Sequence, residues 1–207
     1  SLLAGHSCIN MFATPEAIPF FQRVIELAKD DLSLVDYRMQ ALEGLGDASL
    51  EIGLFDWAIS SYDDFLKLCS DPKDAIRVLR KSSECWLPTN KSDPSKALDL
   101  LNKAEKYGDV DIGEVGRIKR NRGILAIFAG RFKEAERYFS EAEKLFEKSG
   151  ETEELAYTLL EYRAPYLAQG RVKEALEKGK AARQLFASLQ SLEGEATISQ
   201  WLGQVYY

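Results

Sequence analysis

Two short segments near the middle of the sequence hold most of the residues that could bind a charged ligand. Their side chains are Arg77, Arg80 and Lys81 in the first segment, and Arg117, Lys119, Arg120, Asn121 and Arg122 in the second. Clustered guanidinium and ammonium groups suit carboxylates and phosphates. The clustering opposes the sign of the whole chain, which has 27 Lys and Arg against 33 Asp and Glu. A partner with an acidic segment is therefore expected at these positions.

Other candidate binding residues flank the basic ones in sequence. Glu43, Asp47 and Glu51 are spaced four residues apart, which places them on one face of a helix. A later segment offers Tyr157 together with Leu160, Glu161 and Ala164. Trp201 is a further candidate contact near the end of the sequence. We therefore expect a surface that changes from acidic to basic to apolar along the chain.

The composition excludes several kinds of site. The single histidine, His6, argues against a catalytic triad or a multi-histidine metal site, and Cys8, Cys69 and Cys85 are too scattered for a zinc knuckle or a disulfide framework. No apolar stretch approaches the ~20 residues that cross a bilayer. The net charge of −6 disfavours nucleic acid as a ligand. We expect a cytoplasmic protein with no enzymatic activity, cofactor or metal.

An internal repeat must position these residues. Alanines at positions 17, 58, 97, 135 and 175 lie 41, 39, 38 and 40 residues apart. Around each alanine, small or apolar residues recur at offsets of −3, 0, +4, +7 and +11. This spacing places them on one stripe of an α-helix. No segment shows the alternation of apolar and polar residues that is typical of strands.

Turn and capping signals indicate a second helix in each repeat. Gly53, Gly130 and Gly170 each precede a stripe by two residues, where a glycine allows the chain to reverse direction. Upstream, small residues mark expected close contacts between helices, at Gly5, Gly46, Ser83, Gly123 and Gly203. Asp71-Pro72, Asp93-Pro94 and Thr14-Pro15 resemble helix starts with a polar N-cap. Because one helical hairpin cannot bury its apolar face alone, we expect stacked hairpins that form a solenoid.

Several segments resemble the tetratricopeptide repeat (TPR). Residues 53–65 and 130–142 resemble its second helix, and Leu42, Leu45 and Gly46, like 201–206, resemble its first. The period here is nearer 40 than the usual 34, as in a subclass with longer helices. HEAT-type repeats share that period but would not supply the Gly-x-aromatic-x-x-Ala turn. The resemblance implies an all-α, right-handed α-solenoid of antiparallel helix pairs, with the first helices lining a concave face.

This pattern predicts a single TPR-like domain over 1–207, with repeats at 1–34, 35–71, 72–110, 111–150 and 151–191 and a half repeat at 192–207. Pro165 should kink the first helix of the fifth repeat, and Pro19 lies one turn into a helix. The sequence ends without a helix-stop signal, so we expect a piece of a longer chain.

Two functions are compatible with the sequence. The first is a protein–protein interaction scaffold that binds a peptide or helical segment in its concave groove, through Glu43, Asp47, Tyr157 and the basic centre. The second is a sensor or self-association arm of a larger signalling ATPase or transcription regulator, in which the final half repeat exposes Trp201, Leu202, Tyr206 and Tyr207. A structural reading of the basic residues also stays open: they could be solvated or paired with acids of adjacent helices.

Overall fold

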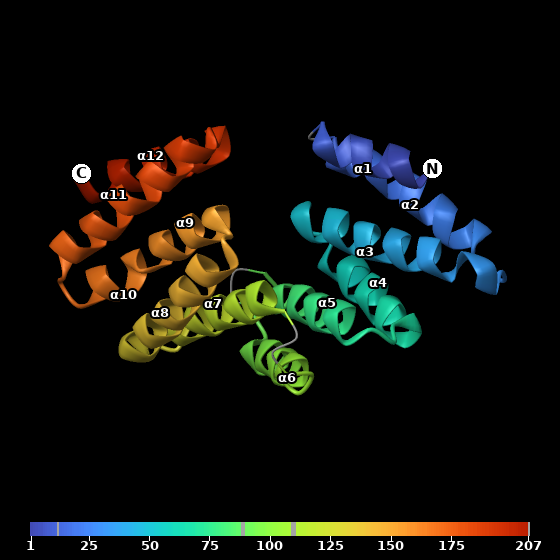
Figure 1. The fold of residues 1–207 in the computed structure, drawn as a ribbon, viewed down its shortest axis with the longest axis horizontal. Coiled ribbons are helices and arrows are strands. Elements are labelled where there is room, and N and C mark those ends of the chain that lie inside the picture. Colours follow the sequence, from blue (N-terminus) through green and yellow to red (C-terminus); the bar gives the residue numbers. More distant parts are fainter. Residues whose placement is uncertain (12, 88–89, 109–110, 207) are drawn as a thin grey trace. The chain divides into compact units, whose positions relative to one another are not determined.

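The computed structural model consists of α-helices joined by short turns, and it describes residues 1–11, 13–87, 90–108 and 111–206 (Figure 1). The chain divides into two compact units, unit 1 (Ser1–Val110) and unit 2 (Asp111–Tyr207). This boundary coincides with the expected boundary between the third and fourth repeats. The single domain expected for residues 1–207 stays a prediction.

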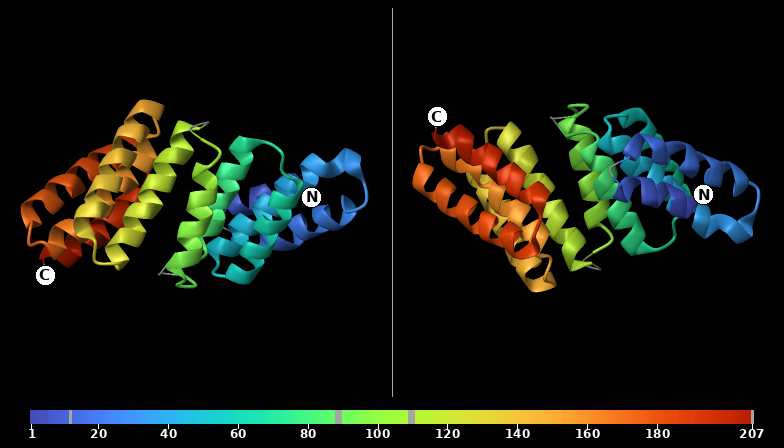
Figure 2. Two further views of the ribbon diagram at one scale, coloured as in Figure 1. Left: turned by 90° about the horizontal axis from the view of Figure 1, so that it is seen from below. Right: turned by 90° about the horizontal axis from the view of Figure 1, so that it is seen from above.

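In its described residues, unit 1 contains three helical hairpins and one short 3₁₀ turn. The pairs are α1–α2, α3–α4 and α5–α6, with the bounds α1 Leu2–Asn10, α2 Thr14–Leu27, η1 Leu32–Leu34, α3 Val35–Glu51, α4 Phe55–Leu68, α5 Pro72–Glu84 and α6 Pro94–Glu105. Unit 2 contains the pairs α7–α8 and α9/α10–α11, followed by α12 (Figure 2). Its bounds are α7 Ile112–Phe128, α8 Phe132–Ser149, α9 Thr152–Glu161, α10 Arg163–Ala168, α11 Val172–Leu189 and α12 Leu192–Tyr206. The expected architecture of stacked helix pairs is confirmed.

The expected turns have a common backbone geometry. Gly53, Gly130 and Gly170 have φ of 78°, 69° and 71°, a region that side chains with a Cβ avoid. In each turn the next residue donates its N–H to a carbonyl five residues back, at 2.7, 2.9 and 2.8 Å. This is the hydrogen-bond pattern of a helix that ends on a glycine. The three glycines therefore allow the first helix of each pair to reverse into the second.

Two of the three expected N-caps are present at the starts of their helices. The carboxylates of Asp71 and Asp93 accept hydrogen bonds from the backbone N–H of Lys73 and Lys96, which caps α5 and α6. The cap expected at Thr14 is wrong, because Thr14 is the first residue of α2 and no side chain caps that helix. Thr14 is only 3% exposed and packs in the interior.

The two prolines within expected helices have different effects. The helix in the fifth repeat is broken at Tyr162, between α9 and α10, three residues before Pro165. Pro165 lacks an N–H, and its ring would clash with the carbonyl four residues earlier, so the expected disturbance appears as an interruption at Tyr162, whose backbone keeps helical dihedral angles. By contrast, α2 continues through Pro19, whose missing hydrogen bond would fall in the first turns of the helix.

The core is built from the alanine stripe and the large side chains that follow it. All five stripe alanines are at most 1% exposed, and Phe21, Tyr62 and Phe139 are fully buried. The aromatic rings occupy space that a Cβ on the facing glycine would fill. An ideal Cβ on Gly46 would lie 2.4 Å from the ring of Tyr62, and one on Gly123 would lie 2.3 Å from Phe139.

The same close packing recurs at Gly5, where an ideal Cβ would lie 2.7 Å from Phe21, and Ser83 is fully buried at the corresponding place in the third repeat. Gly203 lies outside the part of the chain whose burial the structure describes. The expected close contacts between first and second helices are therefore confirmed at Gly5, Gly46 and Gly123, and Ser83 is confirmed as buried.

Candidate functional site: two networks of paired ions

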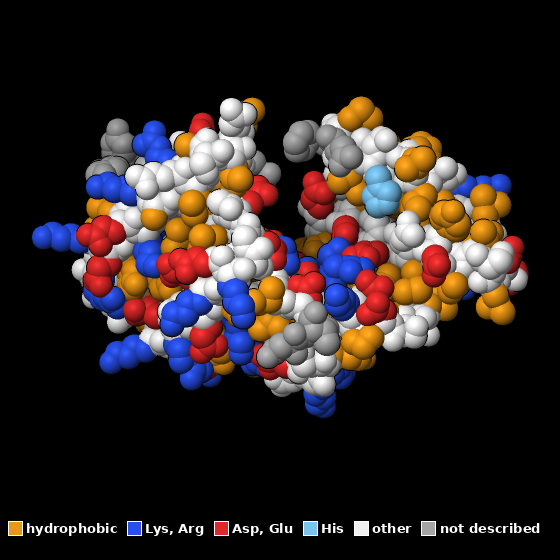
Figure 3. All heavy atoms as spheres, in the orientation of Figure 1, with side chains coloured by type: hydrophobic (Ala, Val, Ile, Leu, Met, Phe, Trp, Pro, Cys, Tyr) orange, Lys and Arg blue, Asp and Glu red, His pale blue; other side chains and the backbone are white. Residues whose placement is uncertain are grey.

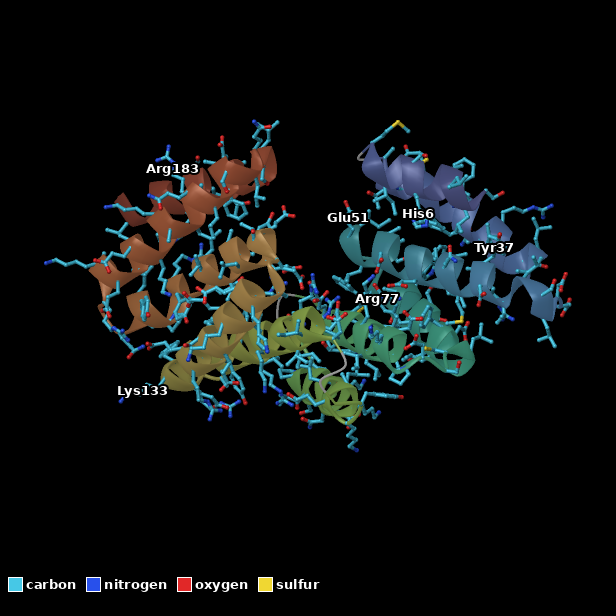
Figure 4. The ribbon with its side chains drawn as sticks, viewed as in Figure 1. His6, Tyr37, Glu51, Arg77, Lys133 and Arg183 are labelled. Atoms are coloured by element: carbon cyan, nitrogen blue, oxygen red, sulfur yellow. The ribbon has the colours of Figure 1, made fainter. Side chains whose placement is uncertain are left out.

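In unit 1, acidic residues of α3 meet basic residues of α5. The guanidinium of Arg77 donates from Nε and Nη2 to the two carboxylate oxygens of Glu43, at 2.7 and 2.9 Å. Lys81 bridges Glu43 and Asp47, at 2.7 Å from an oxygen of each. Figure 4 shows Arg77 on the side of α5 that lies toward α3. We call Glu43, Asp47, Asp74, Arg77 and Lys81 the α3–α5 network.

The α3–α5 network continues to a second acid of α5 and to the core. Asp74, one turn before Arg77 on α5, lies 2.7 Å from Nη1 of that arginine. The hydroxyl of buried Tyr62 donates to Asp47 at 2.8 Å. This bond ties Asp47 to the interior, because Tyr62 itself is fixed by contact with Gly46. The network therefore has a fixed base and an outer edge at which Asp47 is 40% and Arg77 33% exposed.

Electrostatics stabilise the charged form of Glu43. Burial alone would raise the pKa of this carboxyl, but the hydrogen bonds from Arg77 and the charge of Lys81 outweigh burial and lower it to about 2. The bond to Glu43 likewise raises the pKa of the Arg77 guanidinium. Both groups are therefore ionised throughout the physiological range.

Unit 2 has a similar arrangement between α7 and α9. Arg117 donates from Nε to Glu154 at 2.8 Å and also pairs with Glu151 and, at 3.2 Å, with Glu114. Arg120 pairs with the second oxygen of Glu154. The two arginines oppose the effect of burial and lower the pKa of Glu154. We call Glu114, Arg117, Arg120, Glu151 and Glu154 the α7–α9 network.

A further carboxylate lies near the end of α9. Burial raises the pKa of Glu161, and the charges of Arg120 and Arg163 only partly counteract this effect. Two acids of the same helix thus respond in opposite directions, since Glu154 has direct hydrogen bonds from arginines. Tyr157, between them in sequence, is half-buried, with its ring edge toward Phe186 at 5.0 Å between centroids.

The candidate residues thus divide between the two units, and most of the basic ones are paired with acids. Each network has three carboxylates and two cations, so neither is basic in total. Lys119 lies 3.6 Å from Glu141, and Arg80 lies 2.7 Å from Glu84. Within each unit, pairing with acids of the same or an adjacent helix therefore accounts for most of the cations that the sequence offered as ligands.

Three of the expected contact residues are buried. Arg80 is 7%, Asn121 2% and Trp201 2% exposed. The expected exposure of Trp201 is wrong, because its ring packs where a Cβ on Gly179 would lie only 1.8 Å away. Gly179 stands four residues after the stripe alanine, where the other repeats have a large residue, and so it leaves room for the indole of Trp201. Leu202, Tyr206 and Tyr207, expected to be exposed with it, lie outside the side chains that the structure describes.

The acids of the α7–α9 network are not among the residues that the sequence offers as candidates. In sequence, the adjacent acids Glu153 and Glu154 are typical of a solvated helix face, but Glu154 is paired with Arg117 and Arg120. The signal that would have predicted these ion pairs is the separation in sequence between an acid and a base. Glu43 and Arg77, Asp47 and Lys81, Arg117 and Glu151, and Arg120 and Glu154 are all 34 residues apart. An acid and a base at that spacing face each other from successive first helices.

Two other kinds of site find no support in the part of the chain that the structure describes. No three His, Cys, Asp or Glu side chains are grouped there so that they could hold a metal ion. None of the described helices combines the length and the apolar character that spanning a membrane requires.

Solved structures with the same arrangement of helices are known. No protein-family model matches the sequence, and no curated protein matches it significantly. Among solved structures, TTC0263, a thermophilic TPR protein of Thermus thermophilus, has a TM-score of 0.71 at 18% identity, over 97% of this chain and 96% of its own. A Rap protein complexed with Competence and Sporulation Factor has a TM-score of 0.77 at 14% identity, over 98% of this chain and 63% of its own.

A third similar structure is the APC/C hetero-tetramer Cut9–Hcn1, with a TM-score of 0.72 at 16% identity. It is matched over 99% of this chain and 35% of its own. These likenesses agree with the repeat period, the glycine turns and the helix pairs of both units. The chain has the fold of the tetratricopeptide-repeat proteins, as the resemblance in its sequence predicts.

Proposed function

We propose that the chain is a protein-binding module without catalytic activity, and that its first helices contact a peptide or helical segment of a partner. The observation that carries this proposal is the convergence of both signs of charge on successive first helices. In unit 1 the outer edge of the α3–α5 network leaves Asp47 and Arg77 partly exposed. A partner's side chains can meet both groups without unfolding either helix.

The pairing of the cations refines the kind of segment that fits. Arg77 uses three of its nitrogens on Glu43 and Asp74, so a purely acidic segment would have to displace an existing partner. A segment with charges of both signs avoids this displacement, because a basic residue can approach Asp47 while an acidic one approaches the exposed edge of Arg77. Such complementarity sets register and partner choice more than affinity.

Two structural neighbours support a protein or peptide as the partner. The Rap structure is a complex with Competence and Sporulation Factor, and the Cut9 structure is a complex with Hcn1. For the present chain, the same fold with preformed charged edges favours the same general mode of binding. A rigid, preorganised surface loses little conformational entropy when it binds.

The test begins with a displayed random-peptide library selected on the immobilised chain. A selected peptide is then synthesised, and its Kd is measured with the wild type, Arg77→Gln and Asp47→Asn. We expect at least tenfold weaker binding to one of these variants, and a Kd that rises with salt. Lys133→Gln is the matched control, because Lys133 is an exposed cation at the start of α8 (Figure 4).

Circular dichroism of each variant confirms that the fold is retained before binding is compared. Selected peptides that bind all variants equally, at low and high salt, would remove the α3–α5 network from the proposed function. Light scattering of the chain alone measures the alternative, a self-association arm. A concentration-dependent dimer that is unaffected by the selected peptides would favour that alternative.

A further inference from the structure

Unit 1 has an apolar groove between the second helices α2 and α4, away from the paired ions. Its floor is formed by Leu42 and Leu45 of α3, and the whole groove has a volume of about 320 Å³. One wall consists of Gln22, Ile25 and Glu26 of α2, and the other consists of Trp57, Ser60, Ser61 and Asp64 of α4. Residues 57 to 64 span two helical turns, so the groove is about 10 Å long.

The repeat register explains why the groove is open in this hairpin. At the position three residues after the stripe alanine, each of the other four repeats has a large side chain. These side chains are Phe20, Leu100, Tyr138 and Lys178. The second repeat has Ser61 there. The Ser61 hydroxyl donates to the carbonyl of Trp57 at 2.8 Å, so it is turned back onto its own helix. The space that a large residue would fill therefore stays empty above Leu42 and Leu45.

A second departure from the register gives the groove an aromatic wall. One residue before the stripe alanine, the other repeats have a charged side chain, and the four residues are Glu16, Lys96, Glu134 and Glu174. The second repeat has Trp57, whose side chain is 49% exposed. Figure 3 shows hydrophobic side chains on the surface of unit 1 among charged ones. A half-exposed tryptophan beside an apolar hollow is a frequent anchor of protein interfaces.

The charges at the rim indicate what the occupant carries. The two ionisable residues that line the groove, Glu26 and Asp64, are both acidic. Asp64 pairs with Lys67 at 2.8 Å, but the two side chains are 46% and 72% exposed. Such an exposed ion pair contributes little to stability, so another cation can readily replace Lys67 beside Asp64. A lysine or arginine of a partner would therefore find two carboxylates beside the apolar floor.

We propose that this groove binds a cationic amphipathic segment of a partner protein. An apolar side chain of the segment enters the hollow above Leu42 and Leu45 and packs against the Trp57 ring, while flanking lysine or arginine side chains meet Glu26 and Asp64. The walls of this site lie on second helices, and none of its lining residues belongs to the α3–α5 network, so it is a binding surface beyond the proposed function. Two surfaces would allow the module to hold two segments together.

The test uses a displayed random 12-residue peptide library, with binders to Trp57→Glu removed before selection on the wild type. We expect the selected peptides to share a large apolar residue with Lys or Arg within four positions of it. For a synthetic selected peptide, Ser61→Leu and Trp57→Glu should each raise the Kd at least tenfold. Both substitutions install residue types that other repeats carry at the same place.

Two controls separate this site from general attraction of cations to an acidic chain. Tyr37→Glu makes the same change in charge at another exposed aromatic residue of unit 1, labelled in Figure 4, and should leave the Kd unchanged. Arg77→Gln should also leave it unchanged, so failure of this site is distinguishable from failure of the proposed function. If Ser61→Leu perturbs the fold, Trp57→Glu, at an exposed position, still decides the outcome.

Three results would overturn the proposal. The first is a selection that yields no peptide sensitive to Trp57→Glu. The second is a set of sensitive peptides that lack basic residues, which would contradict the role of the acidic rim. The third is a wild-type dimer in light scattering that Trp57→Glu dissociates, which would show that a second copy of the chain occupies the groove.

Discussion

Replacing Glu43 with Gln removes the central carboxylate of the α3–α5 network and leaves the fold otherwise intact. Arg77 and Lys81 then lose the group that both of them contact. The pKa of Glu43 is lowered from 4.5 to about 2 in the folded chain. At 1.36 kcal/mol for each pH unit, this change corresponds to about 3 kcal/mol of stability. The Glu43 side chain is only 17% exposed, so solvent screens this interaction weakly.

The pH dependence has a defined sign. A carboxyl whose pKa is lower in the folded state stabilises the protein above its unfolded pKa, and this contribution declines as pH falls toward the folded pKa. The difference between wild type and Glu43→Gln should be complete above about pH 5. It should lose more than half of its size by pH 3 and be small at pH 2.

Urea denaturation followed by tryptophan fluorescence and circular dichroism measures this difference at pH 7 and pH 3. Trp57 and Trp86 report on unit 1 and Trp201 on unit 2, so the loss should appear first in the unit 1 transition. The matched control is Asp64→Asn, whose exposed pair with Lys67 is screened by solvent and should contribute far less to stability. A Glu43→Gln cost no larger than that of the control, or one that is equal at both pH values, would refute the reasoning.

Three further predictions concern packing and thiol chemistry. Gly46→Ala should destabilise the chain by about 1–3 kcal/mol in urea denaturation, because the new Cβ would lie 2.4 Å from Tyr62. A stabilising effect, which is the usual result of Gly→Ala in an exposed helix, would contradict the contact between Gly46 and Tyr62. Phe186→Ala should cost about 3–5 kcal/mol in the unit 2 transition, since its ring is fully buried, and a cost below 1 kcal/mol would refute this. Cys85 is fully buried, and burial raises its pKa to about 12. Iodoacetamide at pH 8 should therefore modify the partly exposed Cys8 before Cys85, which peptide mass spectrometry measures. Equal labelling of the two cysteines would be evidence against the burial of Cys85.

The repeat was predictable from the sequence because its determinants are local. A glycine with positive φ at Gly53 or Gly130 and a stripe of small and aromatic residues depend on the conformation of a few neighbouring residues. The pairing of Gly46 with Tyr62 also follows from the hairpin, since the glycine and the ring lie 16 residues apart on helices joined by one turn. Break points such as Pro165 belong to the same class, because the missing N–H acts within its own helix.

The candidate site depended on contacts between repeats, and the 34-residue separation that marks them has meaning only once the stacking of the first helices is known. Arg120 and Glu154 pair across 34 residues, and only the stacking of α7 against α9 decides that this carboxylate is not simply solvated. Trp201 is buried because Gly179 of another helix makes room for it. The groove beside Trp57 combines Ser61 of α4 with a floor, Leu42 and Leu45, that belongs to a different helix. Local patterns determine which residues a helix presents, whereas the packing of helices from different repeats determines what each residue meets.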